Sequence, residues 1–229
     1  MKNLVFAFFA SLLLFGCGSP DLDNAKTLKS LDEIIAEAID GDKLEKRGKE
    51  GEELIYASNV QMPYTGWVKY ENGQVWSLAH FKDGKRNGLT MGWYKNGQKK
   101  EEENYKDGKR DGLKTAWYIT GQKWEEGNFK DGKRDGLKAA WYKNGQKKEE
   151  GNSKDGLLVT VIVWKPNGEK CPITNVVDGN GVYVRYREDG TQSSRWSFKD
   201  GELVETVSYR KDGTVNSRFT FKDGKFVAD

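Results

Sequence analysis

The sequence predicts an all-β protein, an elongated antiparallel meander of β-hairpins with one short helix near its N-terminus. The phrase Lys-Asp-Gly begins at Lys82 and returns at a constant step of 24 residues, at Lys106, Lys130 and Lys154. A second glycine pair keeps the same step, at Asn72-Gly73, Asn96-Gly97, Thr120-Gly121 and Asn144-Gly145. The chain also contains 27 glycines, 12% aromatic and only 36% hydrophobic residues. These observations indicate short strands joined by tight turns.

Each 24-residue unit is therefore expected to hold two strands and two turns. Asn-Gly is the strongest short hairpin signal, because a type I′ turn needs positive φ at both central residues, and Asp-Gly offers the same geometry. A two-residue loop at Asn96-Gly97 places Tyr94 opposite Lys99 and Trp93 opposite Lys100. Repetition at a fixed period predicts an array in which each unit packs on its neighbours.

Alternation along each strand then sorts the aromatic residues onto two faces. One face receives a Tyr/Phe ladder, which comprises Tyr94, Tyr105, Tyr118, Phe129 and Tyr142. The other face receives Leu89, Trp93, Leu113, Trp117, Leu137 and Trp141. We expect these ladders to form the core, because the chain has little aliphatic content. The alternative is that some of them form an exposed binding surface for a peptide or glycan, with Trp93, Trp117, Trp141, Tyr94, Tyr118 and Tyr142 as candidates.

Basic residues recur at the Asp-Gly turns and are expected to line one rim of the sheet. The candidates are Lys85, Arg86, Lys109, Arg110, Lys133 and Arg134. Such a rim suits anionic lipid headgroups or an acidic partner. The alternative is that the charges only maintain solubility and protect the sheet from aggregation. The net charge of the whole chain is only +3, which together with the export signal described next argues against nucleic acid as a partner.

Residues 1–16 have the composition of an export signal, with one lysine followed by a short apolar run. Leu14-Phe15-Gly16-Cys17 resembles the lipobox of bacterial lipoproteins, in which the cysteine is lipidated and becomes the mature N-terminus. The resemblance implies an exported protein anchored in the cell envelope through Cys17, and Gly18 in place of aspartate favours the outer membrane. Cys171 is then unpaired and is expected to be a small buried residue before Pro172; a reactive thiol or an intermolecular bridge is the alternative.

The rest of the chain divides by composition. Residues 17–29 form the lipidated cysteine and a flexible tether, and residues 30–52 form a short amphipathic helix and a charged connector. Ser30 and Glu33 match a capping box, the apolar stripe is Leu31, Ile34, Ile35 and Ala38, and Asp40-Gly41 offers a stop. Residues 53–156 hold the regular repeats, with the segment Glu-Glu-Leu-Ile-Tyr-Ala-Ser as a leading strand. Residues 157–229 hold degenerate repeats that are expected to continue the same sheet.

The unit GLKTAWYITGQKWEEGNFKDGKRDG resembles the MORN-type repeat in its bacterial variant. Gly112, Tyr118, Gly121 and Asp131-Gly132-Lys133 carry this match, as do Gly88, Tyr94, Gly97 and Asp107-Gly108-Lys109 one unit earlier. The resemblance implies a single-layer meander of hairpins. Some bacterial members resemble antitoxin components, and many are lipoproteins.

Nothing in the sequence predicts catalysis, a cofactor, a metal or a small-molecule substrate. His80 is the only histidine, and no motif places a nucleophile or second metal ligand beside it. The expected function is a non-catalytic, lipid-anchored envelope scaffold that binds another macromolecule, and the expected partner is a protein. The alternatives are an antitoxin-like protein that neutralises a toxin, and direct binding of anionic lipid through the basic rim.

Overall fold

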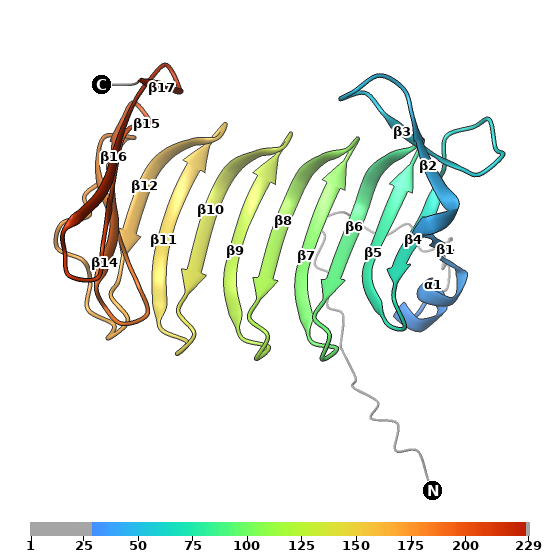
Figure 1. The fold of residues 1–229 in the computed structure, drawn as a ribbon, viewed down its shortest axis with the longest axis horizontal. Coiled ribbons are helices and arrows are strands. Elements are labelled where there is room, and N and C mark those ends of the chain that lie inside the picture. The colour runs from blue at the N-terminus through green and yellow to red at the C-terminus, as the bar shows by residue number, and fades with distance from the viewer. Residues whose placement is uncertain (1–28, 228–229) are drawn as a thin grey trace, which may run out of the picture.

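The computed structural model describes residues 29–227 and confirms the expected all-β hairpin meander (Figure 1). The main sheet has ten strands in the order β1-β4-β5-β6-β7-β8-β9-β10-β11-β12, and all neighbours except β1 and β4 are antiparallel. These strands are β1 (Ile39–Asp40), β4 (Gly66–Glu71), β5 (Val75–Lys82), β6 (Lys85–Trp93), β7 (Lys99–Lys106), β8 (Lys109–Trp117), β9 (Lys123–Lys130), β10 (Lys133–Trp141), β11 (Lys147–Lys154) and β12 (Leu157–Val163). The signal segment and Cys17 lie outside the described residues.

The two kinds of glycine turn differ in geometry. In the Asp-Gly turns both residues have positive φ, for example 50° at Asp107 and 84° at Gly108, as a two-residue type I′ loop requires. The Asn-Gly turns were expected to have the same type I′ geometry, but in these turns only the glycine has positive φ. Gly97 N donates to Tyr94 O and Tyr94 N donates to Gln98 O, which makes a three-residue loop. Trp93 therefore pairs with Lys99, not with Lys100.

Asn96 stabilises this turn through hydrogen bonds of its side chain and not, as expected, through a positive φ angle. The Asn96 side chain accepts a hydrogen bond from Gln98 N at 3.1 Å, which is the local contact that fixes an Asx-type turn. Its amide donates to Ile119 O, in the equivalent loop of the next unit, at 3.1 Å. Asn96 thus connects successive loops along one edge of the array and does not need to adopt positive φ itself.

Two further sets of hydrogen bonds repeat along the main sheet. The turn glycines Gly108, Gly132 and Gly156 donate from their backbone N–H to the carbonyls of Arg86, Arg110 and Arg134, each at 2.8 Å. At the other edge, Tyr94, Tyr118 and Tyr142 each donate a hydroxyl to the tryptophan carbonyl of the next unit, Trp117, Trp141 and Trp164, at 2.8–2.9 Å. Each unit is therefore bonded to the next at both ends of its strands as well as along them.

The N-terminal segment covers the first strands on both faces. The helix α1 (Leu31–Glu37) has the predicted capping box between Ser30 and Glu33, but it ends before Asp40-Gly41 because Ala38 is already extended and β1 pairs with β4. Ile34 and Ile35 of α1 pack against Leu78 and Met91 on one face of the sheet. The 3-10 helix η1 (Gly41–Lys43), β2 (Leu44–Arg47) and β3 (Leu54–Ala57) follow, and Leu44 and Ile55 pack over Val68, Ala79 and Phe81 in a second cluster.

The strand expected to lead the main sheet does form, but in a different place. β3 pairs with β2 in a separate two-stranded sheet, so the charged connector of residues 42–52 is partly strand as well. The hairpin β2–β3 is attached to the main sheet through Ile55 N, which donates to Gly84 O at 3.0 Å. The segment therefore covers the start of the array and does not extend it.

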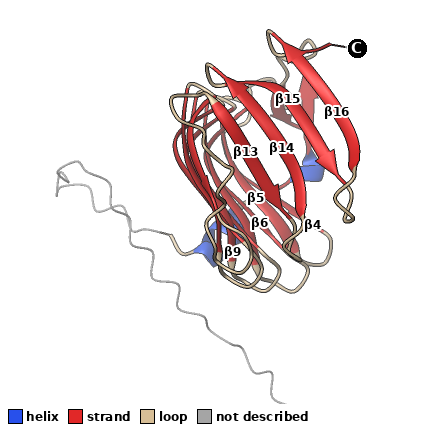
Figure 2. Ribbon diagram, turned by 90° about the vertical axis from the view of Figure 1, so that its left-hand side faces the viewer, coloured by secondary structure: helices blue, strands red, loops and turns tan. Residues whose placement is uncertain are grey.

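The C-terminal repeats were expected to continue the main sheet, but they form a second one. The sheet has five strands in sequential order: β13 (Gly181–Tyr186), β14 (Gln192–Lys199), β15 (Glu202–Tyr209), β16 (Val215–Lys222) and β17 (Lys225–Val227). The inserted segment between β12 and β13 takes the free edge of β12, where Cys171 N donates to Val163 O and Gly179 N to Val159 O. The next hairpins consequently turn away from the main sheet (Figure 2).

The largest group of buried side chains lies where the two sheets meet. It contains Val161 and Val163 of β12, Cys171 and Val176 of the inserted segment, and Tyr183, Val184 and Tyr186 of β13. Trp196 and Phe198 of β14 pack against it. The regular repeats between β6 and β10 contribute little to this core, so their stability depends on contacts between neighbouring strands.

Candidate functional site

Paired residues of adjacent strands share a face, which defines two faces of the main sheet. We call one the tyrosine face; it carries the side chains of Glu103, Tyr105, Lys114, Glu125, Phe129 and Glu149. We call the other the tryptophan face; it carries Leu89, Trp93, Leu113, Trp117, Leu137 and Trp141. The division of the two aromatic ladders agrees with the alternation expected from the sequence.

The tyrosine face is covered at both ends and open between them. At the first strands the hairpin β2–β3 packs over it, and at the last strands β13 does so, where the Tyr183 hydroxyl donates to Glu149. The two coverings lie at opposite ends of the ribbon in Figure 1. The side chains on β6 to β10 of this face form the candidate site.

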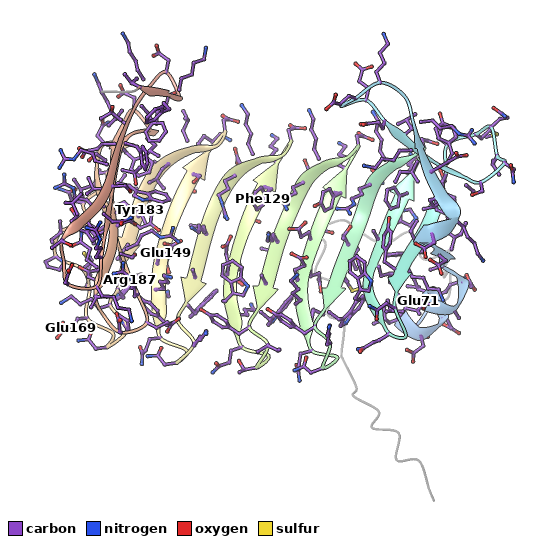
Figure 3. All side chains as sticks on the ribbon, in the orientation of Figure 1. Glu71, Phe129, Glu149, Glu169, Tyr183 and Arg187 are labelled. Atoms are coloured by element: carbon purple, nitrogen blue, oxygen red, sulfur yellow. The ribbon has the colours of Figure 1, made fainter. Side chains whose placement is uncertain are left out.

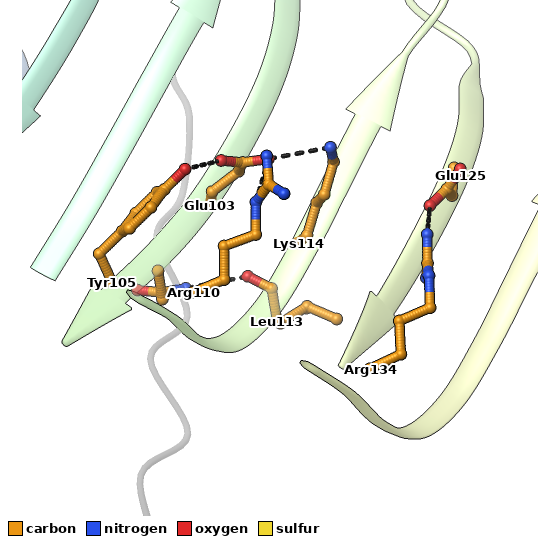
Figure 4. A network of polar contacts seen from close by, with 8 residues as sticks. Glu103, Tyr105, Arg110, Leu113, Lys114, Glu125 and Arg134 are labelled. Carbon is orange, nitrogen blue, oxygen red and sulfur yellow. Dashed lines mark hydrogen bonds and ion pairs between the residues drawn. The ribbon is translucent and has the colours of Figure 1, made fainter. Parts of the chain in front are cut away.

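Glu103 is the best-held carboxylate of this open stretch (Figure 4). Its side chain is only 5% exposed and accepts hydrogen bonds from the Tyr105 hydroxyl at 2.5 Å and from Arg110 Nε at 3.2 Å. Lys114 Nζ lies 2.9 Å from the same carboxylate. Burial on its own raises the pKa of Glu103, but the bonds from Tyr105, Lys114 and Arg110 outweigh it and lower the pKa below its ordinary value. Glu103 therefore stays ionised and neutralises the two cations beside it.

The following units arrange their charges differently. Arg134, the counterpart of Arg110, forms its ion pair with Glu125 (Figure 4), and Lys138, the counterpart of Lys114, pairs with Glu149. Glu149 is buried near Tyr183 (Figure 3), and its pKa is lowered because Lys138 and Tyr183 outweigh the effect of burial. In these units the arginine and the lysine therefore pair with two different glutamates, whereas Arg110 and Lys114 share Glu103.

The arginines of the predicted basic rim extend onto the tyrosine face. The Arg86 guanidinium lies 5.5 Å from the ring centre of Tyr105, and those of Arg110 and Arg134 lie 5.6 Å and 4.9 Å from that of Phe129. Cation–π contacts of this kind keep the guanidinium groups over the rings. Lys85, Lys109 and Lys133 remain at the exposed turns. The six candidates therefore divide into three arginines on the face and three lysines at the rim.

The six aromatic candidates divide as well. Tyr142 is fully buried, and Tyr94 and Tyr118 are partly buried, with all three hydroxyls used in the bonds between units described above. Trp93 packs near α1 on the tryptophan face, whereas Trp117 and Trp141 lie beyond the helix. Lys99 Nζ lies 5.2 Å from the ring centre of Trp117. The tyrosines therefore have a structural role, and all three tryptophans are partly buried.

The tryptophan face exposes aliphatic side chains where α1 no longer covers it. Leu89 packs in the cluster beneath the helix, while its counterparts Leu113 and Leu137 are 47% and 67% exposed. A hollow of about 410 Å³ borders Leu137 and is lined further by Ile162 and by the inserted segment at Val176 and Val177. This face is the second accessible surface of the repeats.

His80 and Cys171, the residues considered for catalysis or metal binding, both make contacts that are typical of structural residues. His80 Nδ1 lies 2.7 Å from Asn87 O, and its ring packs edge-on against Trp67. Cys171 is buried, as expected, with its Sγ 3.2 Å from the Tyr186 hydroxyl. Within residues 29–227 there is no group of three or more His, Cys, Asp or Glu residues suited to a metal ion. None of the helices in this range is long and apolar enough to cross a membrane.

Residues 68–83 and 86–107 match the family described as MORN repeat variant. The matched stretch covers β4 to β7 and includes Arg86, Glu103 and Tyr105 of the tyrosine face. Repeats of this family are generally binding or scaffold modules and not enzymes. No curated protein is significantly similar to the chain.

Proposed function

We propose that this protein is a lipid-anchored scaffold of the bacterial cell envelope that binds a protein partner through its repeat sheet and has no catalytic activity. The open stretch of the tyrosine face between its two end coverings is the observation that carries the proposal. Partly exposed Arg110 and Arg134 lie over the ring of Phe129 there. Arginine and aromatic residues are enriched where proteins bind one another.

The two ends of the chain fit this arrangement. The coverings at β2–β3 and at β13 protect the first and last strands of the main sheet, as end caps of repeat proteins do. The repeats between them keep both faces accessible. A lipid on Cys17 would hold this surface at the membrane, with residues 18–29 as a spacer of a polar sequence.

The anchor is tested by metabolic labelling with palmitate in a bacterial host. We expect the wild type to incorporate label and to fractionate with membranes, and Cys17→Ala to lose both. A wild-type protein without label refutes the lipid anchor, and its position after sucrose-gradient separation distinguishes the inner from the outer membrane.

The binding surface is tested by crosslinking in intact cells and comparing matched variants. Lys138→Glu changes the tyrosine face, and Lys123→Glu changes a half-exposed lysine that pairs with Glu126 on the other face. We expect one defined protein crosslink to disappear with Lys138→Glu and to persist with Lys123→Glu. Equal crosslinking of both variants to that protein excludes the tyrosine face as the binding surface. If the partner proves to be a toxin, relief of its toxicity by co-expression identifies the antitoxin-like alternative.

Anionic lipid is a second candidate ligand because the turn lysines are exposed. Lys85, Lys109 and Lys133 occupy equivalent exposed positions along one edge of the array. Flotation with vesicles of phosphatidylglycerol, compared with vesicles of phosphatidylcholine, measures this directly. The Cys17→Ala protein should float with the anionic vesicles at low salt, and substitution of the three lysines by glutamine should abolish it. Absence of flotation at low salt eliminates this candidate.

A further inference from the structure

The repeat position that holds Glu103 carries no carboxylate in the neighbouring units, where it is occupied by Ala79, Gly127 and Gly151. Glu103 has Gly127 as its counterpart 24 residues later. The residues that contact Glu103 also have equivalents 24 residues later, which are Arg134 for Arg110, Lys138 for Lys114 and Phe129 for Tyr105. The cations are therefore kept from one unit to the next while the anion between them is removed.

Arg134 shows the effect of this difference. A Cβ atom at Gly127 would lie 2.8 Å from Arg134 Nη1, so the guanidinium rests on the bare glycine. Its Nη2 is bonded to Glu125, but Nη1 is buried and has no hydrogen-bond partner within the described residues. A guanidinium has five N–H donors, and an unpaired buried donor is costly. Arg134 thus retains donors that an added carboxylate can use.

The surroundings of Gly127 favour an anion. The Arg134 and Lys138 side chains are 31% and 26% exposed, and Arg134 Nη1 itself is buried beneath the exposed part of its side chain. Toward β13, Lys148 lies over the ring of Tyr142, and burial and the nearby Arg185 lower its pKa. Arg185 and Lys138 disfavour the charged form of Lys148, whereas Glu149 and Glu188 favour it.

We propose that an acidic side chain of the partner protein binds at Gly127, between Arg134 and Lys138, in the place that Glu103 occupies one unit earlier. This inference rests on the proposed binding function and specifies the chemistry of the partner. Glu103 demonstrates that this constellation accommodates a carboxylate, with a hydrogen bond from an arginine Nε and a lysine Nζ at 2.9 Å. The position lies on the sheet face and not at the rim, which suits an inserted protein segment better than a lipid surface.

Reciprocal substitutions within the repeat test this inference. Gly127→Glu supplies the carboxylate from the chain itself, and Gly127 has a backbone conformation open to other residues, with only the flexible end of Arg134 in the way. Glu103→Gly creates a second unfilled position beside Arg110 and Lys114. The first variant should therefore lose the site, and the second should gain one.

The measurement is fluorescence anisotropy of full-length protein in a non-ionic detergent. The probe is a labelled nonapeptide of alternating Ser and Glu, and the control probe has Gln in place of Glu. We expect the wild type to prefer the acidic peptide at low salt. Gly127→Glu should weaken that binding about tenfold, or about 1.4 kcal/mol, and Glu103→Gly should strengthen it. Circular dichroism and thermal melting verify that each variant is folded.

Three results of the peptide measurement overturn the inference. They are equal binding of both peptides by the wild type, unchanged binding of the acidic peptide by folded Gly127→Glu, and full competition by inorganic phosphate at the peptide's own concentration. The last result identifies a general anion site. The proposed function is judged separately by crosslinking in cells, because a partner crosslink that persists in Gly127→Glu but disappears in Lys138→Glu refutes the carboxylate site and leaves the binding surface in place.

Discussion

The hydrogen bonds from tyrosine to tryptophan carbonyls predict a graded loss of stability along the array. Tyr142→Phe removes a hydroxyl from a fully buried side chain and leaves the Trp164 carbonyl without its donor at 2.8 Å. A hydrogen bond contributes about 0.5–1.5 kcal/mol, and a buried group left unpaired costs about 1–3 kcal/mol. We therefore expect a loss of about 1–2 kcal/mol in the free energy of unfolding. Tyr118→Phe should cost about 0.5–1 kcal/mol, because Tyr118 is only partly buried and water can replace its hydroxyl.

Urea denaturation followed by tryptophan fluorescence measures both values, with unfolding midpoints compared at a common slope. Tyr56→Phe is the matched control, since the Tyr56 hydroxyl makes no hydrogen bond within residues 29–227 and only its ring contacts Arg47. The control should change stability by less than about 0.5 kcal/mol. If Tyr142→Phe is no more destabilising than Tyr56→Phe, or if Tyr118→Phe costs more than Tyr142→Phe, then these bonds do not stabilise the array as argued.

Three further predictions concern the N-terminal covering, the ion network and the tryptophan face. Gly84→Ala should lower the melting temperature clearly more than Gly73→Ala. Both glycines have positive φ, but only at Gly84 would a Cβ atom lie close to Leu54 and Ile55, at 2.8 Å and 3.0 Å. Equal decreases in melting temperature contradict this reasoning. The pKa of Glu103 is lowered, so its stabilising contribution is complete above its ordinary value of 4.5 and is lost as the pH falls through the lowered value. Glu103→Gln should thus cost about 1–3 kcal/mol at pH 7 and progressively less below pH 4.5 in urea titrations, whereas a pH-independent difference argues against the ion network. Leu89→Ala should cost about 1–2 kcal/mol and Leu137→Ala less than about 0.5 kcal/mol, because α1 covers only the first of these equivalent leucines; similar chemical denaturation midpoints for both refute that reasoning.

The period of the sequence was sufficient to predict the hairpins and their alternating faces, and the capping box of Ser30 and Glu33 predicted the start of the helix. These features depend on local signals, since glycine placement and alternation act within one unit. The loop at Asn96 was assigned the wrong turn type because its side-chain bonds to Gln98 N and Ile119 O stabilise an alternative to positive φ. The turn preference of the Asn-Gly dipeptide does not by itself predict those contacts.

Features that depend on distant segments were not predictable in this way. The hairpin β2–β3 packs over Phe81 and its neighbours through Leu44 and Ile55, and no pattern in residues 42–57 indicates that destination. The break after β12 depends on the inserted segment, in which Cys171 takes the place of a further strand at Val163. The sequence nevertheless contained a signal of this break, because the 24-residue step is lost there.

The candidate site contains residues that were not among the predicted site residues, such as Glu103, and it positions the predicted arginines differently from the expectation. Arg86, Arg110 and Arg134 were placed at the rim by their positions beside the turns, yet their long side chains reach the rings on the tyrosine face. Gly127 was not singled out from the sequence. A comparison of units position by position would have found it, because it replaces Glu103 while the basic residues around it are retained.

The bonds between successive units have a consequence for the length of the molecule. Gly108, Gly132 and Gly156 make the same contact with the preceding unit, and so do the tyrosines at the opposite edge. Removing or adding 24 residues within the regular repeats would remove or add one set of these contacts and allow the remaining units to keep theirs. Each such change alters the array by two strands, or about 10 Å. The number of repeats therefore fixes the distance between the N-terminal covering and the C-terminal sheet in discrete steps.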